Sequence, residues 1–306
     1  MGPWLVAIVG ATATGKTALS IQLARRLDGE IINADSRQIY RGMDIGTAKP
    51  SPAERDRARH WLIDVADPDE AFTLASFLDL ARAALGDIWK RGKRPVVVGG
   101  TGQYIWALLE AWRVPRVPPD AALRTELEQI AATRGAPALL EELRGIDPES
   151  AATIDPRNVR RVIRAIEVTR ATGRPFSSWR ARDQPAFDAT IIGLRMDRDR
   201  LYTGIDSRVD AMIERGLVDE VRGLNTAGYG CGLPSMASIG YREICAYLRS
   251  ELTLAEASAR IKTESHRLVR MQNTWFRADD QRIAWLDAGA SDLTERASAI
   301  ATAGES

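Results

Sequence analysis

The chain has few of the residues that build metal sites or disulfide frameworks. Its 306 residues include only two cysteines, Cys231 and Cys245, and two histidines, His60 and His266. Two cysteines are too few for a disulfide framework, and these four residues do not have the spacing of a zinc site. We therefore expect two reduced thiols, as in a cytoplasmic protein, and no zinc.

Long apolar runs are absent as well. No stretch approaches the roughly 20 apolar residues of a membrane-spanning helix, and the N-terminal segment has no basic leader. Repeats and low-complexity tracts are also lacking. We expect a soluble globular protein of the cytoplasm that makes no use of the membrane and acts as a monomer.

The chain has almost no net charge. Its 42 basic and 41 acidic side chains give a formal charge of +1, so a nucleic-acid partner would need a local basic surface. The hydrophobic content of 45% over 306 residues is enough for one sizeable core and a smaller attached module.

Short apolar runs alternate with amphipathic segments in the first third of the chain. We expect strands over residues 4–9, 30–34, 61–63 and 95–98. Helices are expected after the first strand, where Leu19, Leu23 and Leu27 are spaced by four, and from a cap at Thr73 to about Lys90. This alternation predicts an α/β fold with a doubly wound, mostly parallel sheet, in which ligands bind beyond the carboxyl ends of the strands. The loop after Gly10, Asp35 and Thr101 would all lie at that edge.

The pattern changes after a linker that contains Pro115, Pro118 and Pro119. We expect an inserted all-helical domain over residues 117–186, between two parts of the α/β core at 1–116 and 187–306. One of its helices would start at Asp155-Pro156 and end at Gly173. A strand over residues 190–194 then returns to the core, and helices follow to the end of the chain.

Residues 10–17 match the pattern G-x-x-x-x-G-K-[ST] between a strand and a helix, which is the context a P-loop requires. Backbone N–H groups and the helix N-terminus of such a loop bind phosphate oxygens, while the lysine adds a point charge and the threonine can hold Mg²⁺. We expect a nucleotide- or diphosphate-binding site, with a nucleoside triphosphate such as ATP as the default ligand. Its residues are Gly10, Ala11, Thr12, Ala13, Thr14, Gly15, Lys16 and Thr17.

Three further polar residues follow predicted strands, and each has two interpretations. Asp35 is either a general base or metal ligand, or a residue that caps a helix or stabilises its loop. Asp64 is either a Walker B acid that supports Mg²⁺ through water, or part of a turn with Asp67. Thr101 either reaches a phosphate oxygen or caps the helix that begins near Gln103.

Arginine is concentrated in the expected helical domain. Residues 157–182 contain eight arginines and one acid, Glu167, and Arg157, Arg160, Arg161 and Arg164 share one helical face. A charged face is usually only solvated, but this composition favours contact with RNA phosphates. The later segment 266–277 is a second basic helix with aromatic residues, for which core packing with a solvated face is the best interpretation when the segment is taken alone.

Together these segments resemble the tRNA dimethylallyltransferase family, also called the tRNA isopentenyltransferase family, over nearly the whole chain. The matching motifs are the P-loop, Asp35-Ser-Arg-Gln-Ile-Tyr40, Gly42-Met-Asp-Ile-Gly-Thr-Ala-Lys-Pro50, His60-Trp-Leu-Ile-Asp64, Gly99-Gly-Thr-Gly-Gln-Tyr104, Ile239-Gly-Tyr-Arg-Glu243 and Gln272-Asn-Thr-Trp-Phe-Arg277. The lack of Cys/His pairs near the C-terminus resembles the compact bacterial form of the family, because eukaryotic relatives carry a zinc finger there.

The resemblance implies that the P-loop binds dimethylallyl diphosphate and that the acceptor is N6 of the tRNA adenosine on the 3′ side of the anticodon, position 37. Asp35 would take the amine proton, and Lys16, Thr101 and Mg²⁺ at Thr17 would neutralise the leaving diphosphate. The implied tRNA contacts are Asp35, Ser36, Arg37, Gln38, Thr101, Arg124, Arg160, Arg161, Val162, Ile163 and Arg164.

The chain departs from the family pattern at Ala237, where some relatives have an arginine that binds diphosphate. We expect Arg242 or another basic residue to take that role. Three alternatives remain at this point: a P-loop kinase of a small metabolite, an enzyme that prenylates free AMP or ADP, and a nucleotide-gated RNA-binding protein without turnover.

Overall fold

The computed structural model of the protein describes residues 2–304. These residues form two compact units: the first comprises the chain up to Leu109 and from Pro185 onward, and the second comprises Glu110–Gln184. The helical domain expected over 117–186 differs from the second unit at both boundaries.

The first unit contains a six-stranded sheet with the strand order β3-β2-β4-β1-β5-β6, in which every pair is parallel. The strands are β1 (Trp4–Gly10), β2 (Gly29–Asn33), β3 (His60–Trp61), β4 (Arg94–Val98), β5 (Asp188–Arg195) and β6 (Ile283–Asp287). The strands on one side of β1, which are β4, β2 and β3, precede the helical insertion in the sequence. The strands on its other side, β5 and β6, follow the insertion. This arrangement confirms the expected doubly wound parallel sheet.

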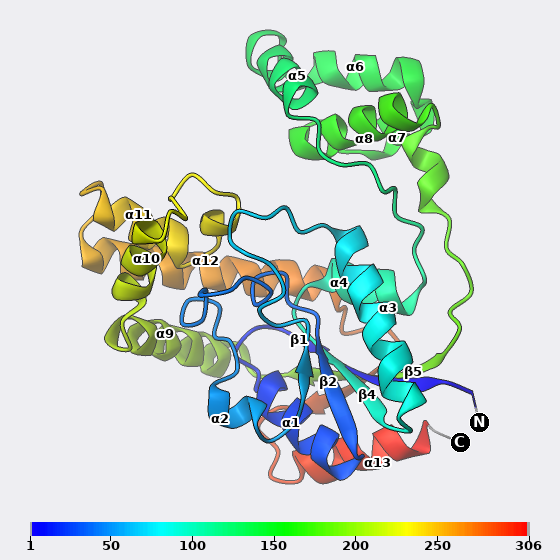
Figure 1. Ribbon diagram of the computed structural model, residues 1–306, viewed down its shortest axis with the longest axis vertical. Coiled ribbons are helices and arrows are strands. Elements are labelled where there is room, and N and C mark those ends of the chain that lie inside the picture. Colours follow the sequence, from blue (N-terminus) through cyan, green and yellow to red (C-terminus); the bar gives the residue numbers. More distant parts are fainter. Residues whose placement is uncertain (1, 305–306) are drawn as a thin grey trace. The chain divides into compact units, whose positions relative to one another are not determined.

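Helices cover both faces of this sheet (Figure 1). On one face, α1 (Lys16–Arg26) and α13 (Leu293–Ala303) pack in a core with alternate strand residues such as Val6 and Ile8. The strand residues between them, such as Leu5 and Val97, are fully buried too, and α3 (Leu74–Lys90) contacts β2 and β4. Because both faces are covered, the strands read as continuous apolar runs rather than as alternating ones.

A second core of the first unit lies among helices from the C-terminal half. These elements are α9 (Arg198–Glu214), α10 (Leu217–Thr226), the 3-10 turn η2 (Ser235–Ala237), α11 (Tyr241–Leu248) and α12 (Leu254–Trp275), and the unit also contains α2 (Pro52–Arg55) and α4 (Gly102–Leu109). Tyr241 and Met43 are fully buried in this core. The chain that follows β2 is therefore held by helices that lie about 200 residues later in the sequence.

The second unit consists of helices around its own apolar core. They are α5 (Ala121–Arg134), α6 (Ala136–Ile146), α7 (Pro148–Thr153), α8 (Val159–Thr172) and the 3-10 helix η1 (Phe176–Arg180). The side chain of Asn158 caps α8, so the helix begins later than the expected start at Asp155-Pro156. Its end is as predicted, because Gly173 follows it with φ of 66°, a conformation that favours glycine.

Two strands differ from the sequence-based expectation. The third strand is only His60–Trp61, because Leu62 and Asp64 turn the backbone into the left-handed region with φ of 63° and 57°. The C-terminal part is not purely helical, since β6 adds an edge strand beside β5. No helix within residues 2–304 is long and apolar enough to cross a membrane.

Candidate functional site

The predicted P-loop forms the connection between β1 and α1. Gly10 has φ of 136°, and a Cβ there would lie 2.5 Å from the Leu194 carbonyl oxygen. Gly15 adopts the left-handed conformation with φ of 84° just before α1 begins at Lys16. Inside the loop, the Thr14 hydroxyl donates to the Ala11 carbonyl at 2.9 Å. These constraints hold the loop around the N-terminus of α1, where backbone dipoles favour an anion.

Gln272 of α12 joins the P-loop to the glycine turn after β4. Its Oε1 accepts from the Thr12 N–H at 2.8 Å, and its Nε2 donates to the Gly100 carbonyl at 3.1 Å. A Cβ on Gly100 would lie 2.3 Å from that Nε2, so a side chain there would displace the Gln272 amide. The matching motif around Gln272 was visible in the sequence, but its bridging role was not.

The P-loop opens into a cavity of about 480 Å³ at the carboxyl edge of the sheet. Of the residues predicted for the site, seven line it: Thr12, Ala13, Gly15, Lys16, Thr17, Asp35 and Gln38. Gly10, Ala11 and Thr14 shape the loop without lining the cavity. The structure thus brings the P-loop and the Asp35 carboxylate together in one cavity, as strand order at this edge requires.

Asp35 lies two residues after β2 and is half-buried. Its Oδ1 accepts from the Arg37 N–H at 2.9 Å, which is the loop-stabilising bond of one interpretation. No hydrogen bond within residues 2–304 engages its Oδ2, so one carboxylate oxygen is left to face the cavity. The two interpretations of Asp35 are therefore compatible.

Thr101 does not line the cavity but supports the turn that carries Asp35. Its Oγ1 accepts from the Ser36 N–H at 3.0 Å and contacts Ser36 Oγ at 3.3 Å. The Thr101 carbonyl, rather than the hydroxyl, accepts from the first N–H groups of α4. The side-chain cap of one interpretation of Thr101 is therefore not formed.

Lys16 carries the cation of the P-loop. Its Nζ donates to the Ala11 carbonyl at 2.6 Å. Burial of the ammonium lowers the pKa of Lys16 to about 8; the Asp35 carboxylate acts against this shift, and the Arg208 cation adds to it. Lys16 is thus poised to be stabilised by an incoming anion.

Two arginines, one within α9 and one directly after its last residue, line the same cavity and were missed by sequence reasoning. Arg208 and Arg215, together with Gly204, lie on one face of α9 because the spacings of four and eleven residues are near whole helical turns. Burial lowers the pKa of Arg208, while the Asp35 carboxylate opposes that shift. Periodicity predicted a helix here but did not indicate which face would meet the P-loop.

Asp64 is not among the residues that line the cavity, and two cations engage its carboxylate. Its carboxylate binds Nζ of the buried Lys49 at 2.6 Å and the Arg55 guanidinium at 2.7 Å. Burial alone would raise the pKa of Asp64, but hydrogen bonds from Lys49 and Arg55 outweigh burial and lower it. Asp64 therefore neutralises Lys49, which lines the cavity.

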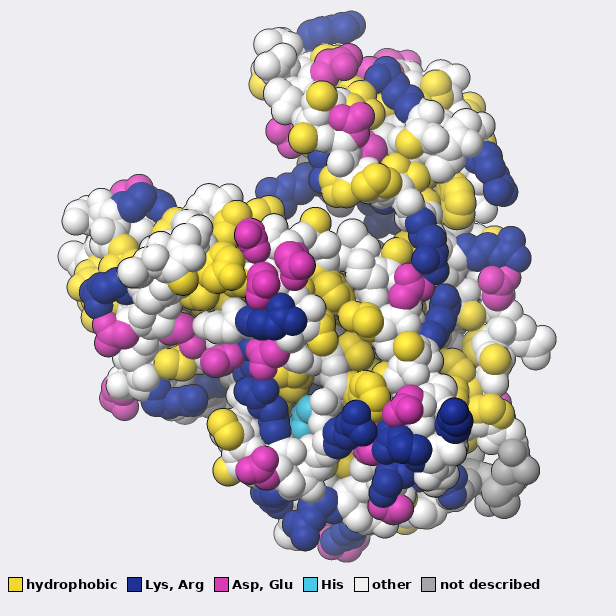
Figure 2. Space-filling view, viewed as in Figure 1, with side chains coloured by type: hydrophobic (Ala, Val, Ile, Leu, Met, Phe, Trp, Pro, Cys, Tyr) yellow, Lys and Arg dark blue, Asp and Glu magenta, His cyan; other side chains and the backbone are white. Residues whose placement is uncertain are grey.

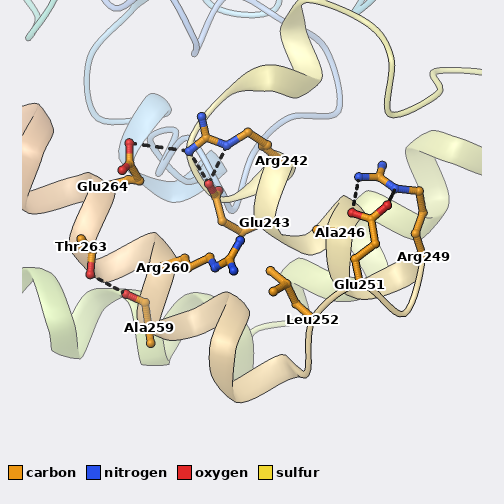
Figure 3. Close-up of a pocket in the computed structure, with 10 residues that line it drawn as sticks. All are labelled: Arg242, Glu243, Ala246, Arg249, Glu251, Leu252, Ala259, Arg260, Thr263 and Glu264. Carbon is orange, nitrogen blue, oxygen red and sulfur yellow. Dashed lines mark hydrogen bonds and ion pairs between the residues drawn. The ribbon is translucent and has the colours of Figure 1, made fainter.

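Arg242 is not brought to the P-loop cavity, contrary to the expectation that it binds diphosphate. It lines a separate pocket of about 500 Å³ between α11 and α12 (Figure 3). There its guanidinium pairs with Glu243, whose side chain is almost fully buried, and approaches Glu264 at 3.6 Å. Because these two acids occupy it, Arg208 and Arg215 are the better placed cations.

The arginine stripe of the second unit divides into two kinds of side chain. Arg160 and Arg161 are exposed, whereas Arg124 and Arg164 both bind the carboxylate of the buried Glu167. Burial alone would raise the pKa of Glu167, but the bonds from Arg124 and Arg164 lower it to about 2. Arg164, although it belongs to the arginine face expected from the sequence, is therefore held by Glu167.

Val162 and Ile163 lie in the core of the second unit, with 0% and 3% of their surface exposed. Their side chains are not available to RNA, so the implied contacts at these two positions are corrected. On the face of the molecule in Figure 2, basic and acidic side chains are interspersed. A nucleic-acid surface must therefore be local, as the net charge of +1 indicated.

The two cysteines form a disulfide, whereas the sequence led us to expect free thiols. Cys231 and Cys245 are bonded with Cα atoms 5.8 Å apart. The bond joins the loop after α10 to α11 within the second core of the first unit.

The described residues offer few side chains that could bind a metal ion at this site. Residues 2–304 contain no group of three or more His, Cys, Asp or Glu side chains that could hold a metal ion. Thr17 lines the cavity, and no hydrogen bond of the described chain engages its hydroxyl. This donor set fits Mg²⁺, which commonly keeps several waters and takes its other ligands from substrate phosphates.

Comparisons with known proteins show which family the chain resembles in sequence and in fold. The family model described as IPP transferase matches residues 38–279. A tRNA dimethylallyltransferase of Roseiflexus sp. (strain RS-1) is 52% identical over 97% of both chains. Among solved structures, the tRNA isopentenylpyrophosphate transferase of Bacillus halodurans is 41% identical, covers 99% of this chain and 98% of its own, and has a TM-score of 0.71.

A eukaryotic dimethylallyltransferase acting on tRNA has a TM-score of 0.81 at 27% identity, over 99% of this chain and 79% of its own. The region that matches these structures thus includes both the first unit, with its P-loop, and the inserted helical unit. The chain belongs to the IPP transferase family.

Proposed function

We propose that the protein transfers a dimethylallyl group from dimethylallyl diphosphate to N6 of adenosine 37 in tRNA, next to the anticodon on its 3′ side. The observation that carries this proposal is that Lys16, Thr17 and Asp35 line one cavity of about 480 Å³. A P-loop alone would suit a kinase, but the carboxylate of Asp35 adds an acceptor for the proton of an attacking amine.

The chemistry breaks one bond and forms another. The bond between C1 of the dimethylallyl group and the diphosphate oxygen breaks, and its electron pair leaves with diphosphate. The N6 lone pair forms the new bond to C1, and the N6 proton passes to the free oxygen of Asp35. The products are N6-dimethylallyl-adenosine and diphosphate.

The leaving diphosphate is bound at the cationic end of the cavity. The Lys16 ammonium, the N–H groups of the P-loop and the Arg208 guanidinium would each stabilise the negative charge that develops there. Mg²⁺ held by Thr17 would supply further charge neutralisation to the same oxygens. Arg215 lies on the same face of α9 and extends this end of the cavity.

The adenosine enters from the Asp35 end. Gln38 also lines the cavity and offers an amide to the base, while Thr101 and Ser36 hold the turn on which Asp35 lies. A base must leave its stack to reach such a cavity, and the cost of a few kcal/mol is offset by other contacts with the anticodon loop.

The helical unit is the source we propose for those other contacts. Arg160 and Arg161 are exposed on α8 and free to meet phosphates. Arg124 is half-buried in its ion pair with Glu167, so it would act mainly by holding that surface in place. Because one chain supplies both the P-loop and Asp35, the reaction needs no second copy, and we propose a monomer of the cytoplasm.

Mass spectrometry of tRNA after incubation with dimethylallyl diphosphate tests the proposal. We expect a mass increase of one dimethylallyl group on the adenosine next to the anticodon. Modified free AMP or ADP with unmodified tRNA would favour the free-nucleotide alternative. Phosphate released from ATP, with no prenylated product, would favour the kinase.

A further inference from the structure

We infer that Glu220 is a positioning residue that orients the Gln38 amide for the target adenosine, an inference that rests on the proposed function. Glu220 belongs to α10 and does not line the cavity. Glu220 acts on the site through segment 44–48: Glu220 binds the start of this segment, and the end of the segment binds Gln38. This segment is part of the family motif, but neither the motif nor its spacing indicates what holds it.

The Glu220 carboxylate binds three consecutive backbone N–H groups of that segment. Oε2 accepts from Asp44 N at 3.0 Å and from Ile45 N at 2.7 Å, and Oε1 accepts from Gly46 N at 3.2 Å. A carboxylate that accepts several N–H bonds fixes the path of the backbone around it. Segment 44–48 is therefore anchored at one point on α10.

Tyr241 completes the anchor. Its hydroxyl donates to Glu220 Oε1 at 2.7 Å, and its ring is fully buried. A Cβ on Gly46 would lie 2.5 Å from a carbon of that ring, so the backbone of the segment packs directly on Tyr241. Burial raises the pKa of the Tyr241 hydroxyl and the Glu220 charge raises it further, so it remains a donor.

The other end of the segment holds Gln38. The Gln38 Nε2 donates to the Thr47 carbonyl at 3.2 Å and to the Ala48 carbonyl at 3.3 Å. Two acceptors at the nitrogen settle which way the amide faces, since a flipped amide would place its oxygen against both carbonyls. No bond within the described chain engages Oε1, so Gln38 presents this acceptor at the cavity.

An acceptor at this position suits adenine. The exocyclic amine of adenine has two N–H donors: one can pass its proton to Asp35 and the other can bind Gln38 Oε1. Glu220, through segment 44–48, keeps that oxygen in place. Loss of Glu220 should then lower the efficiency of RNA use without changing donor binding.

A double-mutant cycle tests this route. We would measure kcat/KM for an anticodon stem-loop RNA, and the dissociation constant of dimethylallyl diphosphate, for wild type, Gln38→Ala, Glu220→Ala and the double variant. Glu220→Ala and Gln38→Ala should each lower kcat/KM about fivefold to tenfold, the effect of one lost hydrogen bond. The double variant should be no worse than Gln38→Ala, because residues that act through one another are not additive.

Asp219→Ala is the matched control, since Asp219 is the exposed neighbour of Glu220 and pairs with Arg222 on the same helix. It should leave kcat/KM unchanged. If Glu220→Ala does not fold, Glu220→Gln carries the same cycle, because its amide cannot accept from all four donors. The inference would be overturned if the Glu220 substitution lowered kcat/KM by the same factor in the wild-type and the Gln38→Ala backgrounds. A weaker affinity for dimethylallyl diphosphate would overturn it as well. An inactive wild type would instead contradict the proposed function.

Discussion

Thr101 Oγ1 accepts a hydrogen bond from the backbone N–H of Ser36 at 3.0 Å, which ties the turn after β4 to the turn after β2. The Ser36 N–H follows Asp35 directly, so this bond sets where the Asp35 carboxylate lies. Thr101 thus acts on the proposed base through the backbone.

Thr101→Val keeps the shape of the side chain but removes the acceptor, and leaves the Ser36 N–H without a partner. We expect kcat for tRNA prenylation to fall about tenfold, since an unpaired, part-buried donor costs on the order of 1 kcal/mol or more. Thr101→Ser keeps the hydroxyl and should retain most of the activity. Equal kcat values for the valine and serine variants would contradict this role.

Arg208→Met should weaken use of the prenyl donor. Loss of a charge-assisted hydrogen bond corresponds to about tenfold to hundredfold in the KM for dimethylallyl diphosphate. RNA affinity, measured by filter binding, should not change. Arg242→Met is the matched control because Arg242 lies in a separate pocket. A larger effect from Arg242 than from Arg208 would show that the donor binds elsewhere.

Arg160→Ala with Arg161→Ala should weaken tRNA binding. Each phosphate contact contributes roughly 0.7 to the slope of log affinity against log salt in single-stranded regions, so we expect the slope to flatten by about 1 to 2. Arg134→Ala removes an exposed arginine from α5 and serves as the control. Folding should survive, because both residues of the pair are exposed. Wild-type affinity with an unchanged slope would mean that this face is only solvated.

Glu167 should make the stability of the protein depend on pH in the acid range. Its pKa is lowered to about 2 from an ordinary value of 4.5, so the stabilisation is complete above 4.5 and is lost as the pH falls toward 2. We expect the difference in Tm between wild type and Glu167→Gln to be largest above pH 4.5 and to shrink toward pH 2. A difference that does not vary over this range would show that the Arg124 and Arg164 bonds do not stabilise the charged form.

Local sequence signals were sufficient where the partner of a residue lies nearby in the chain. The P-loop, β1, the Thr73 cap of α3 and the glycine that ends α8 all depend on neighbouring residues, and they occur where expected. Asp35 could be placed beside the P-loop because parallel strands end at a common edge.

Residues whose partners lie far away could not be placed in this way. Arg164 is on the arginine face of α8, yet its guanidinium also donates to the Val117 carbonyl, 47 residues away in the sequence, and no periodicity reveals that contact. Arg208 reaches the cavity only because α9 packs against α12, more than 40 residues later. β6 contains a short apolar run over residues 283–286, which is itself a strand signal that sequence reasoning missed, but its pairing with the distant β5 could not be read from that run.

The central claim is that the Asp35 carboxylate takes the proton from the adenosine amine, and Asp35→Asn tests it most directly. The amide keeps the shape and the bond to the Arg37 N–H but cannot accept that proton. In single-turnover reactions with an anticodon stem-loop RNA and dimethylallyl diphosphate, we expect the rate to fall by two or more orders of magnitude, the usual effect of a lost general base. The RNA affinity of the variant, measured by filter binding, should remain within about twofold of the wild-type value, since the proton transfer occurs in the transition state and not on binding. A near-normal rate in Asp35→Asn would contradict the account.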